Sequence, residues 1–246
     1  NDLQQGAIPV KEDPETVIAS SEQPTDAMAA LDTNASPQTS SQIKRGNQLG
    51  ISLSFGPDIS SINMGNPGRV TMQVGVMLNY PLSKRLSVRA GFLAIRKIYD
   101  ADSADYNPGG NFWAYYPNMQ KIEANCMVYE IPVTLLYNFA PNGKHNWFVS
   151  AGLSTYLMKK ETYEYYYKDN NGQSHSRTWS LSNENNHPFS ILSLSGGYQY
   201  NVNSKLSLVA EPYVKLPLGG VGFGNVKLRG SGILFSVGYK PFAKSK

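Results

Sequence analysis

The feature that most constrains the fold of this chain is a repeated alternation of apolar and polar residues. The alternating segments are joined by connections that are short and long by turns along the chain. The short turns are residues 81–85, 140–146 and 201–205, and the long connections are residues 56–69, 99–121, 160–188 and 219–229. Alternation with a period of two residues predicts β-strands. Three short and four long connections join eight strands, so the pattern predicts an all-β, eight-stranded antiparallel up-and-down β-barrel.

The composition of the two faces predicts which side of each strand points outward. The expected strands cover residues 49–56, 70–80, 86–92, 129–139, 147–154, 192–200, 206–216 and 233–240. Their apolar parity is continuous, whereas the other parity is rich in glycine and serine, which suits the interior of a narrow barrel. A soluble barrel would instead place its large apolar side chains inside. We therefore expect a transmembrane β-barrel of a bacterial outer membrane, with the apolar parity facing lipid.

Aromatic residues near the short turns support this assignment. They are Tyr80, Tyr137, Phe139, Trp147, Tyr198, Tyr200 and Tyr239. Barrels of this class carry aromatic girdles at the membrane interfaces and keep their short turns in the periplasm. With eight strands, both chain termini fall on the side of the short turns. We therefore expect periplasmic N- and C-termini and long loops outside the cell.

The first part of the chain has a different composition from the rest. Residues 1–54 contain no Phe, Trp or Tyr, and residues 1–43 carry seven acidic residues against one lysine. Such a segment buries too little apolar surface to offset the entropy of ordering it. We predict a disordered acidic periplasmic tail or linker at residues 1–45 and a barrel domain at residues 46–246.

Composition also argues against several other classes of protein. The formal net charge is +4, but the basic residues occur singly or in pairs, so we expect no nucleic-acid partner. The single cysteine, Cys126, excludes an internal disulfide. The histidines and the cysteine do not have the spacing of metal ligands, so we expect neither a metal nor another cofactor.

Four charged residues fall on the parity that faces the lumen, namely Arg89, Glu130, Glu211 and Lys215. Their distances from the short turns place them at a similar depth. They could form an ion or proton path, or a paired network that plugs the lumen. We favour the plug because an eight-stranded barrel is filled by its own side chains.

Two prolines, Pro132 and Pro212, lie within expected strands. Proline cannot donate a hydrogen bond, and a closed sheet has no free edge to accommodate it. We therefore expect a β-bulge at each proline, with the preceding Glu130 and Glu211 pointing into the lumen.

Aromatic residues are also concentrated in two of the long connections. The candidate binding residues are Tyr106, Phe112, Trp113, Tyr115, Tyr116, Tyr165, Tyr166, Tyr167 and Trp179. Exposed aromatic rings give a large contact area at little cost in entropy, so this set could bind a glycan or a protein, as an adhesin does. Alternatively, part of the set continues the strands and supplies the outer aromatic girdle.

Catalysis has little support in the sequence. Ser174, His175 and Asp169 have the residue types of a hydrolytic triad. They lie together in one connection, whereas a triad requires partners that different elements hold rigidly. We therefore predict no catalytic residues and no enzyme activity. A lipid-modifying enzyme at the rim and a small pore remain less favoured alternatives.

Three stretches of the barrel region resemble a known family. They are EIPVTLLYNF at residues 130–139, AEPYVKLPL at residues 210–218 and GYKPF at residues 238–242. These stretches are similar to the outer-membrane β-barrel family of Bacteroidota, which includes PorT-like and OmpX-like eight-stranded proteins. The resemblance covers residues 46–246 and implies an adhesin, an assembly accessory or a signalling anchor, without choosing among them.

Together, these observations predict a non-enzymatic, monomeric barrel that acts as a structural, anchoring, signalling or assembly component through its tail. Some Bacteroidota proteins that resemble it connect an inner-membrane anti-sigma module to a terminal barrel, and this chain could be the end of such a protein. The expected partners are outer-membrane lipid and a periplasmic or inner-membrane protein that contacts residues 1–45. The alternative is a surface binding module that uses the aromatic loops.

Overall fold

The computed structural model of the protein describes residues 49–62, 67–141 and 143–242. The chain divides into two compact units, Asn1–Lys44 and Arg45–Lys246, and every described residue belongs to the second unit. The tail that we predict at residues 1–45 therefore lies outside the described residues.

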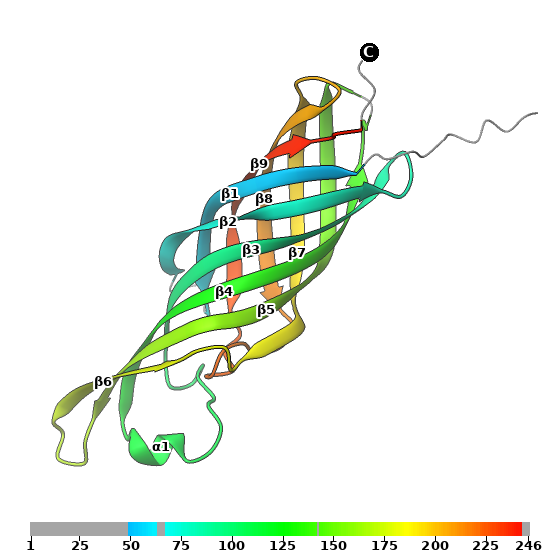
Figure 1. The fold of residues 1–246 in the computed structure, drawn as a ribbon. Helices are drawn as coiled ribbons and strands as arrows, with labels where there is room; N and C mark the ends of the chain where they lie inside the picture. The colour runs from blue at the N-terminus through cyan, green and yellow to red at the C-terminus, as the bar shows by residue number, and fades with distance from the viewer. Residues whose placement is uncertain (1–48, 63–66, 142, 243–246) are drawn as a thin grey trace, which may run out of the picture. The chain divides into compact units, whose positions relative to one another are not determined.

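The described residues form nine β-strands and one short helix (Figure 1). The strands are β1 (Gly50–Ser61), β2 (Pro67–Pro81), β3 (Leu86–Ala101), β4 (Met119–Asn138), β5 (His145–Lys168), β6 (Ser174–Leu181), β7 (Asn186–Asn201), β8 (Leu206–Pro217) and β9 (Arg229–Tyr239), and the helix is α1 (Phe112–Tyr115). None of the described helical structure is long and apolar enough to cross a membrane.

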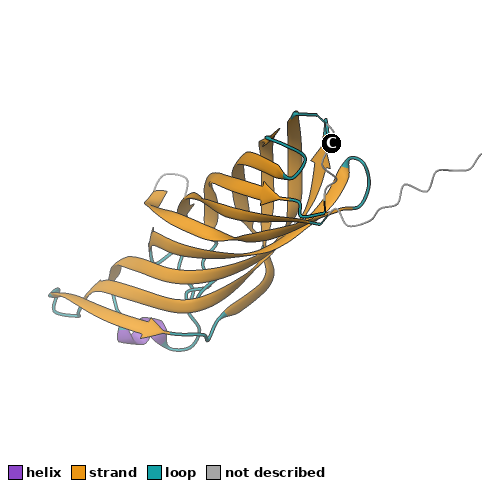
Figure 2. Ribbon diagram, turned by 45° about the horizontal axis from the view of Figure 1, so that its top comes forward, coloured by secondary structure: helices purple, strands orange, loops and turns teal. Residues whose placement is uncertain are grey.

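Eight of the nine strands close into an antiparallel barrel. Strands β1 to β5 pair in chain order, β5 pairs with β7, β7 with β8, β8 with β9, and β9 with β1. Strand β6 has β5 as its one partner among the described strands and forms a hairpin with it. Figure 2 shows this hairpin and α1 together at one end of the barrel. The predicted eight-stranded antiparallel barrel is confirmed.

The wall of the barrel is apolar on its outer surface. In β1, the side chains of Ile51, Leu53 and Phe55 are 42–57% exposed, whereas Ser52 and Ser54 between them are buried. The same alternation continues around the barrel through β2, β8 and β9. Closure satisfies the backbone hydrogen bonds of the wall, and the outer band is suited to lipid contact. The predicted direction of the apolar parity is therefore confirmed.

Strands β3, β4 and β5 continue past the end of this band, and the polarity of their two faces reverses there. Ala94, Tyr129 and Leu157 form the last apolar row of the outer face, since Ala94 pairs with Tyr129 and Tyr129 with Leu157. The next outward row carries the exposed Arg96 and Lys160. Beyond the last apolar row, most outward side chains are polar and most inward ones are apolar. The exceptions are Ile98 and Met127 on the outer face and the buried Lys97 and Glu161 on the inner face.

The interior of this extension is a packed apolar core. Its buried residues are Ile62, Tyr99, Ala101, Tyr106, Ile122, Ala124, Cys126, Val128, Tyr156, Met158, Tyr163, Tyr165, Leu181, Ile191, Val221, Val226 and Leu228. The β3–β4 connection (residues 102–118) and the β8–β9 connection (residues 218–228) fold onto it. We call the extension of β3–β5, the β5–β6 hairpin and these two connections the cap.

Two predicted connections are in fact mostly strand. In residues 56–69, β1 continues to Ser61 and β2 begins at Pro67. Residues 160–188 were expected to form a long loop, but β5 continues to Lys168 and β6 follows at Ser174–Leu181. Inward side chains of this segment, including Tyr163 and Leu181, are buried in the cap core. This core stabilises strands that extend well past the apolar band.

The bulges expected at Pro132 and Pro212 are absent. Pro132 pairs with Ser154, and Pro212 pairs with Ile233, both without a shift of register at these positions. On the side of β4 that faces β3, the pairing stops at Val133 and resumes at Glu130 in the same register. Each proline therefore interrupts the pairing with one neighbouring strand over two residue pairs, and its strand needs no extra residue to accommodate it.

Candidate functional site: the lumen and the cap

The four charged residues predicted for the lumen lie in two ion pairs across the barrel. Arg89 of β3 donates to both carboxylate oxygens of Glu211 of β8, at 2.6 and 2.5 Å. Lys215 of β8 donates to Glu130 Oε2 of β4 at 2.6 Å. The side chains of Arg89 and Glu211 are 11% and 3% exposed. Those of Lys215 and Glu130 are 5% and 0% exposed. This arrangement is a network of buried pairs.

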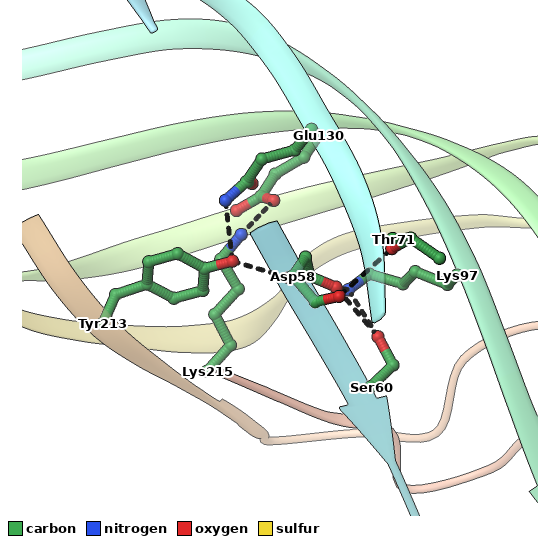
Figure 3. A network of polar contacts seen from close by, with 8 residues as sticks. Asp58, Ser60, Thr71, Lys97, Glu130, Tyr213 and Lys215 are labelled. Carbon is green, nitrogen blue, oxygen red and sulfur yellow. Dashed lines mark hydrogen bonds and ion pairs between the residues drawn. The ribbon is translucent and has the colours of Figure 1, made fainter. Parts of the chain in front are cut away.

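A third buried ion pair was missed by the sequence analysis. Lys97 of β3 donates to Asp58 Oδ2 of β1 at 3.0 Å, and their side chains are 1% and 0% exposed. Asp58 also accepts from Tyr213 at 2.7 Å and from Ser60 at 3.1 Å. Figure 3 shows Tyr213 pointing at Asp58 from one side, with Lys215 reaching Glu130 nearby.

The sequence does contain a signal for this pair. The predicted connection at residues 56–69 includes Asp58, and the third predicted strand ends at residue 92. However, β1 continues to Ser61 and β3 to Ala101. Asp58 has the parity of the buried Ser52, and Lys97 has the parity of Arg89, so continuing the alternation would have placed both residues in the lumen.

Polar side chains between the ion pairs also lie in the lumen and connect its walls. Gln73 of β2 donates to the hydroxyl of Tyr213 at 2.7 Å, which links β2 and β8 to the Asp58 pair. A cavity of about 30 Å³ lies beside Gln73, Glu130 and Glu211, which is enough for about one water molecule. Three acidic and three basic side chains therefore balance one another and occupy the lumen, as a plug does.

The aromatic residues singled out in the sequence lie in the cap, but they do not form one exposed surface. Tyr106 and Tyr165 are each 1% exposed, and their hydroxyl groups lie 2.8 Å apart. We therefore remove these two from the candidate binding surface. They are buried because the β3–β4 connection folds back onto the inner face of β5.

The other members of the set are exposed to different degrees. Phe112, Tyr116 and Trp179 are partly buried and pack against the cap core, and Tyr166 and Tyr167 of β5 are half-buried. Trp113 and Tyr115 of α1 are 38% and 75% exposed.

Hydrogen bonds fix the β8–β9 connection over the mouth of the barrel. The buried carboxylate of Glu161 accepts from the backbone N–H of Phe223 at 2.9 Å and from the side chain of Asn185 at 2.7 Å. His187 Nε2 accepts from the backbone N–H of Gly222 at 2.8 Å. Gly222 has φ of +71°, a left-handed conformation that favours glycine. The connection is thus built to close over the cap core.

The residues of the possible triad lie at the tip of the β5–β6 hairpin. His175 Nε2 lies 3.2 Å from Asp169 Oδ2, and its ring stacks on Tyr167 at 5.6 Å. A backbone hydrogen bond from Gln173, followed by the side-chain contact with His175, lowers the pKa of Asp169. Ser174 precedes His175 in β6, so its side chain is directed to the opposite face of the strand. This geometry does not join a nucleophile to a base.

Residues 49–62, 67–141 and 143–242 contain no arrangement of side chains suited to binding a metal ion. These residues contain no group of three or more His, Cys, Asp or Glu side chains that could hold an ion. Cys126 is buried as a free thiol in the cap core.

The closed wall and its outer apolar band define a transmembrane β-barrel. No protein-family model matches the chain, and no curated protein matches it. Among solved structures, Neisserial surface protein A is 14% identical, with a TM-score of 0.46, and the match covers 79% of this chain and 97% of that one. The attachment invasion locus protein of Yersinia pestis is 12% identical, with a TM-score of 0.43 and coverages of 78% and 98%.

A major outer membrane protein of Thermus thermophilus is 15% identical, with a TM-score of 0.41 and coverages of 78% and 98%. Likenesses at this level carry no argument about the family or the activity of this chain. The resemblance to the Bacteroidota family therefore stays a prediction from the sequence.

Proposed function

We propose that this chain is a monomeric, non-catalytic barrel of the bacterial outer membrane that carries the cap at the cell surface without conducting solutes. The observation that carries the proposal is the reversal of polarity beyond the Ala94–Tyr129–Leu157 row. On one side of this row the wall is built for lipid, and on the other it is built like a water-soluble sheet over an apolar core. Because barrels of this class keep their long connections outside the cell, the cap is extracellular in this proposal.

The buried ion pairs and the cap core both support the proposal that the barrel does not conduct solutes. Two buried ion pairs lie inside the band, the Asp58–Lys97 pair lies at its end, and the cap core closes the barrel beyond it. A barrel that only anchors needs no ordered extension, because short loops would suffice. The cap is therefore the part for which we propose an interaction.

Helix α1 is the place on the cap where aromatic rings are both exposed and firmly supported. Trp113 and Tyr115 face solvent, while Phe112 packs on Tyr165 with ring centroids 5.1 Å apart. Tyr116 packs on the same ring at 5.1 Å. Rings held in this way lose little entropy on binding, which suits a protein or glycan contact.

The test replaces the exposed rings and keeps the supporting ones. Deleting the whole connection would also remove Tyr106 and expose the cap core, so we choose W113S/Y115S, with Y166S on the outer face of β5 as the control. Intact cells that display each variant are compared on a glycan array and by photo-crosslinking of surface proteins. We expect W113S/Y115S to lose at least ten-fold in binding and Y166S to lose none. Binding by W113S/Y115S equal to that of the original chain would refute the role of α1.

A second candidate function places the interaction on the opposite side of the membrane. Ile51 at the start of β1 pairs with Tyr239 at the end of β9, beside the short turns. The chain before β1 therefore joins the barrel at its short-turn end, which is periplasmic in the proposed orientation. This supports a signalling, assembly or anchoring contact between residues 1–45 and a periplasmic or inner-membrane protein, as in the anti-sigma arrangement.

The two candidates differ in which part of the chain holds the partner. A chain that lacks residues 1–45 and the W113S/Y115S variant are each purified from cells after crosslinking. Loss of a periplasmic or inner-membrane protein on deletion of residues 1–45 alone supports the tail-side function. Retention of that protein on the shortened chain would refute it.

A further inference from the structure

Three basic residues lie on the outer face of the cap, directly beyond the apolar band. Arg96 of β3 pairs with Met127 of β4, and Met127 pairs with Lys160 of β5, so this outward row follows the last apolar row. Lys159 stands next to Lys160, and the three basic side chains are exposed. They lie at the level where the polarity of the wall changes.

A β-bulge holds both lysines on the outer face. Met127 pairs with Lys160, whereas Val128 pairs with Met158, so Lys159 is an extra residue in β5. In a regular strand, one of two consecutive lysines would point inward, toward the cap core. The bulge restores the inward direction for the buried Glu161 and leaves two adjacent cations outside.

Lys121, another basic residue on this face of the cap, has acidic partners, whereas these three cations have none among the described residues. Lys121, farther from the band, lies 3.0 Å from Asp100 and 2.7 Å from Glu123. By contrast, Arg96, Lys159 and Lys160 have no salt bridge to any described residue. Arg96 Nε donates to Asn125 Oδ1 at 2.9 Å, and Asn125 lies in the next outward row, on the side away from the band.

The surroundings of the lysines contain one acidic residue from a neighbouring element. The β6–β7 connection reaches this site, because the backbone N–H of Asn183 donates to Lys159 O at 3.3 Å. This connection contributes Glu184, which is exposed. Three basic groups against one carboxylate leave the patch positively charged.

We propose that Arg96, Lys159 and Lys160 bind the phosphate groups of lipid headgroups in the membrane leaflet that surrounds the cap. A guanidinium group matches two phosphate oxygens, and ammonium groups add charge beside it. The Phe92–Tyr129 ring pair, with centroids 5.0 Å apart, lies just below at the boundary between headgroups and acyl chains. This inference rests on the proposed function, because it requires the membrane surface to lie at this row.

The experiment compares two sets of charge removals in the full chain. R96Q/K159Q/K160Q neutralises the patch, and K84Q/R85Q/K144Q removes the same charge from the short turns at the other end. Each protein is purified in an uncharged detergent and titrated by native mass spectrometry with bisphosphorylated lipid A and with its dephosphorylated form. Inorganic phosphate is added as a competitor.

Each basic group near a membrane surface contributes about five-fold to anion binding, so the loss of three predicts about 100-fold weaker binding of lipid A. We expect this loss for R96Q/K159Q/K160Q alone, no difference among the proteins with the dephosphorylated lipid, and no competition by phosphate. Equal affinity of both variants for lipid A would refute the site. Full competition by inorganic phosphate would also overturn the proposal, because it would mean a site for the free ion.

Insertion of each protein into phosphatidylcholine vesicles separates this inference from the proposed function. A barrel that inserts but shows no dependence on the patch contradicts the lipid site alone. A chain that does not insert at all contradicts the proposed function.

Discussion

Removing one charge from the Asp58–Lys97 pair should destabilise the barrel strongly, whereas removing both should not. The side chains are 0% and 1% exposed, so solvent screens their charges very little. Deleting one partner of a buried pair costs about 3–5 kcal/mol, because the other charge stays buried without compensation. We therefore expect D58N and K97M each to lower the free energy of unfolding by about 3 kcal/mol or more.

The double variant D58N/K97M provides the test of this reasoning. The amide oxygen that D58N introduces can still accept the hydrogen bond of Tyr213, and a methionine has about the length of the Lys97 stem that passes Tyr156. With no unpaired charge left, we expect the double variant to be at least as stable as either single variant. A double variant no more stable than either single variant corresponds to a coupling energy of about 3 kcal/mol, and a double variant as stable as the original chain to about 6 kcal/mol.

The assay is equilibrium urea unfolding of the barrel in phosphatidylcholine vesicles, followed by tryptophan fluorescence. K121M is the control, because it removes the contacts of an ammonium group whose side chain is 43% exposed and should cost less than about 1 kcal/mol. If D58N and K97M cost no more than K121M, or if their effects simply add, the lumen network does not hold the barrel in the way we describe.

Three further predictions test separate parts of the structure. A Cβ atom at Gly152 would lie 2.1 Å from Val133 O, whereas one at Gly196 would meet nothing closer than 3.8 Å. In the same urea assay, G152A should therefore lower the free energy of unfolding by about 3 kcal/mol and G196A by almost nothing. The pKa of Asp169 is lowered from 3.8, so its contact with the Gln173 N–H at 2.9 Å should stabilise the turn above that pH. This contact should be lost as the pH falls through the lower folded value, which a pH titration of the Gln173 amide signal by NMR would show, and D169N should abolish the transition. Planar bilayers that contain the protein should show no discrete conductance, and a stable open channel would contradict the plugged lumen.

The barrel could be predicted from the sequence because its determinants are local. Alternation fixes which side chains face lipid, and the positions of turns fix the strand order. The charged residues of the lumen were also identifiable by parity. Their partners were not, because Arg89 and Glu211 are 122 residues apart and meet only through the register of the closed sheet.

The cap was missed although the sequence carries a signal for it. Adjacent apolar residues at Ala94–Ile95, Val128–Tyr129 and Leu157–Met158 mark the point in each strand where the apolar parity changes sides. These dipeptides align across the sheet, since Ile95 pairs with Val128 and Val128 with Met158. Read one strand at a time, they look like the ends of strands. The aromatic residues of residues 102–118 then look exposed, because their burial depends on contacts with β5 that are distant in sequence.

The proposal depends most directly on where β4 enters the membrane. A nitroxide label is placed in turn at each residue of Met119–Asn138, in a chain whose buried Cys126 is replaced by alanine, and the vesicle-bound protein is studied by electron paramagnetic resonance. We expect labels at Tyr129, Val133 and Leu135 to be reached by oxygen dissolved in lipid, and labels at Lys121 and Asn125 to be reached by a water-soluble nickel complex. Lipid contact at residues 121 and 125, or water contact throughout β4, would contradict the proposal.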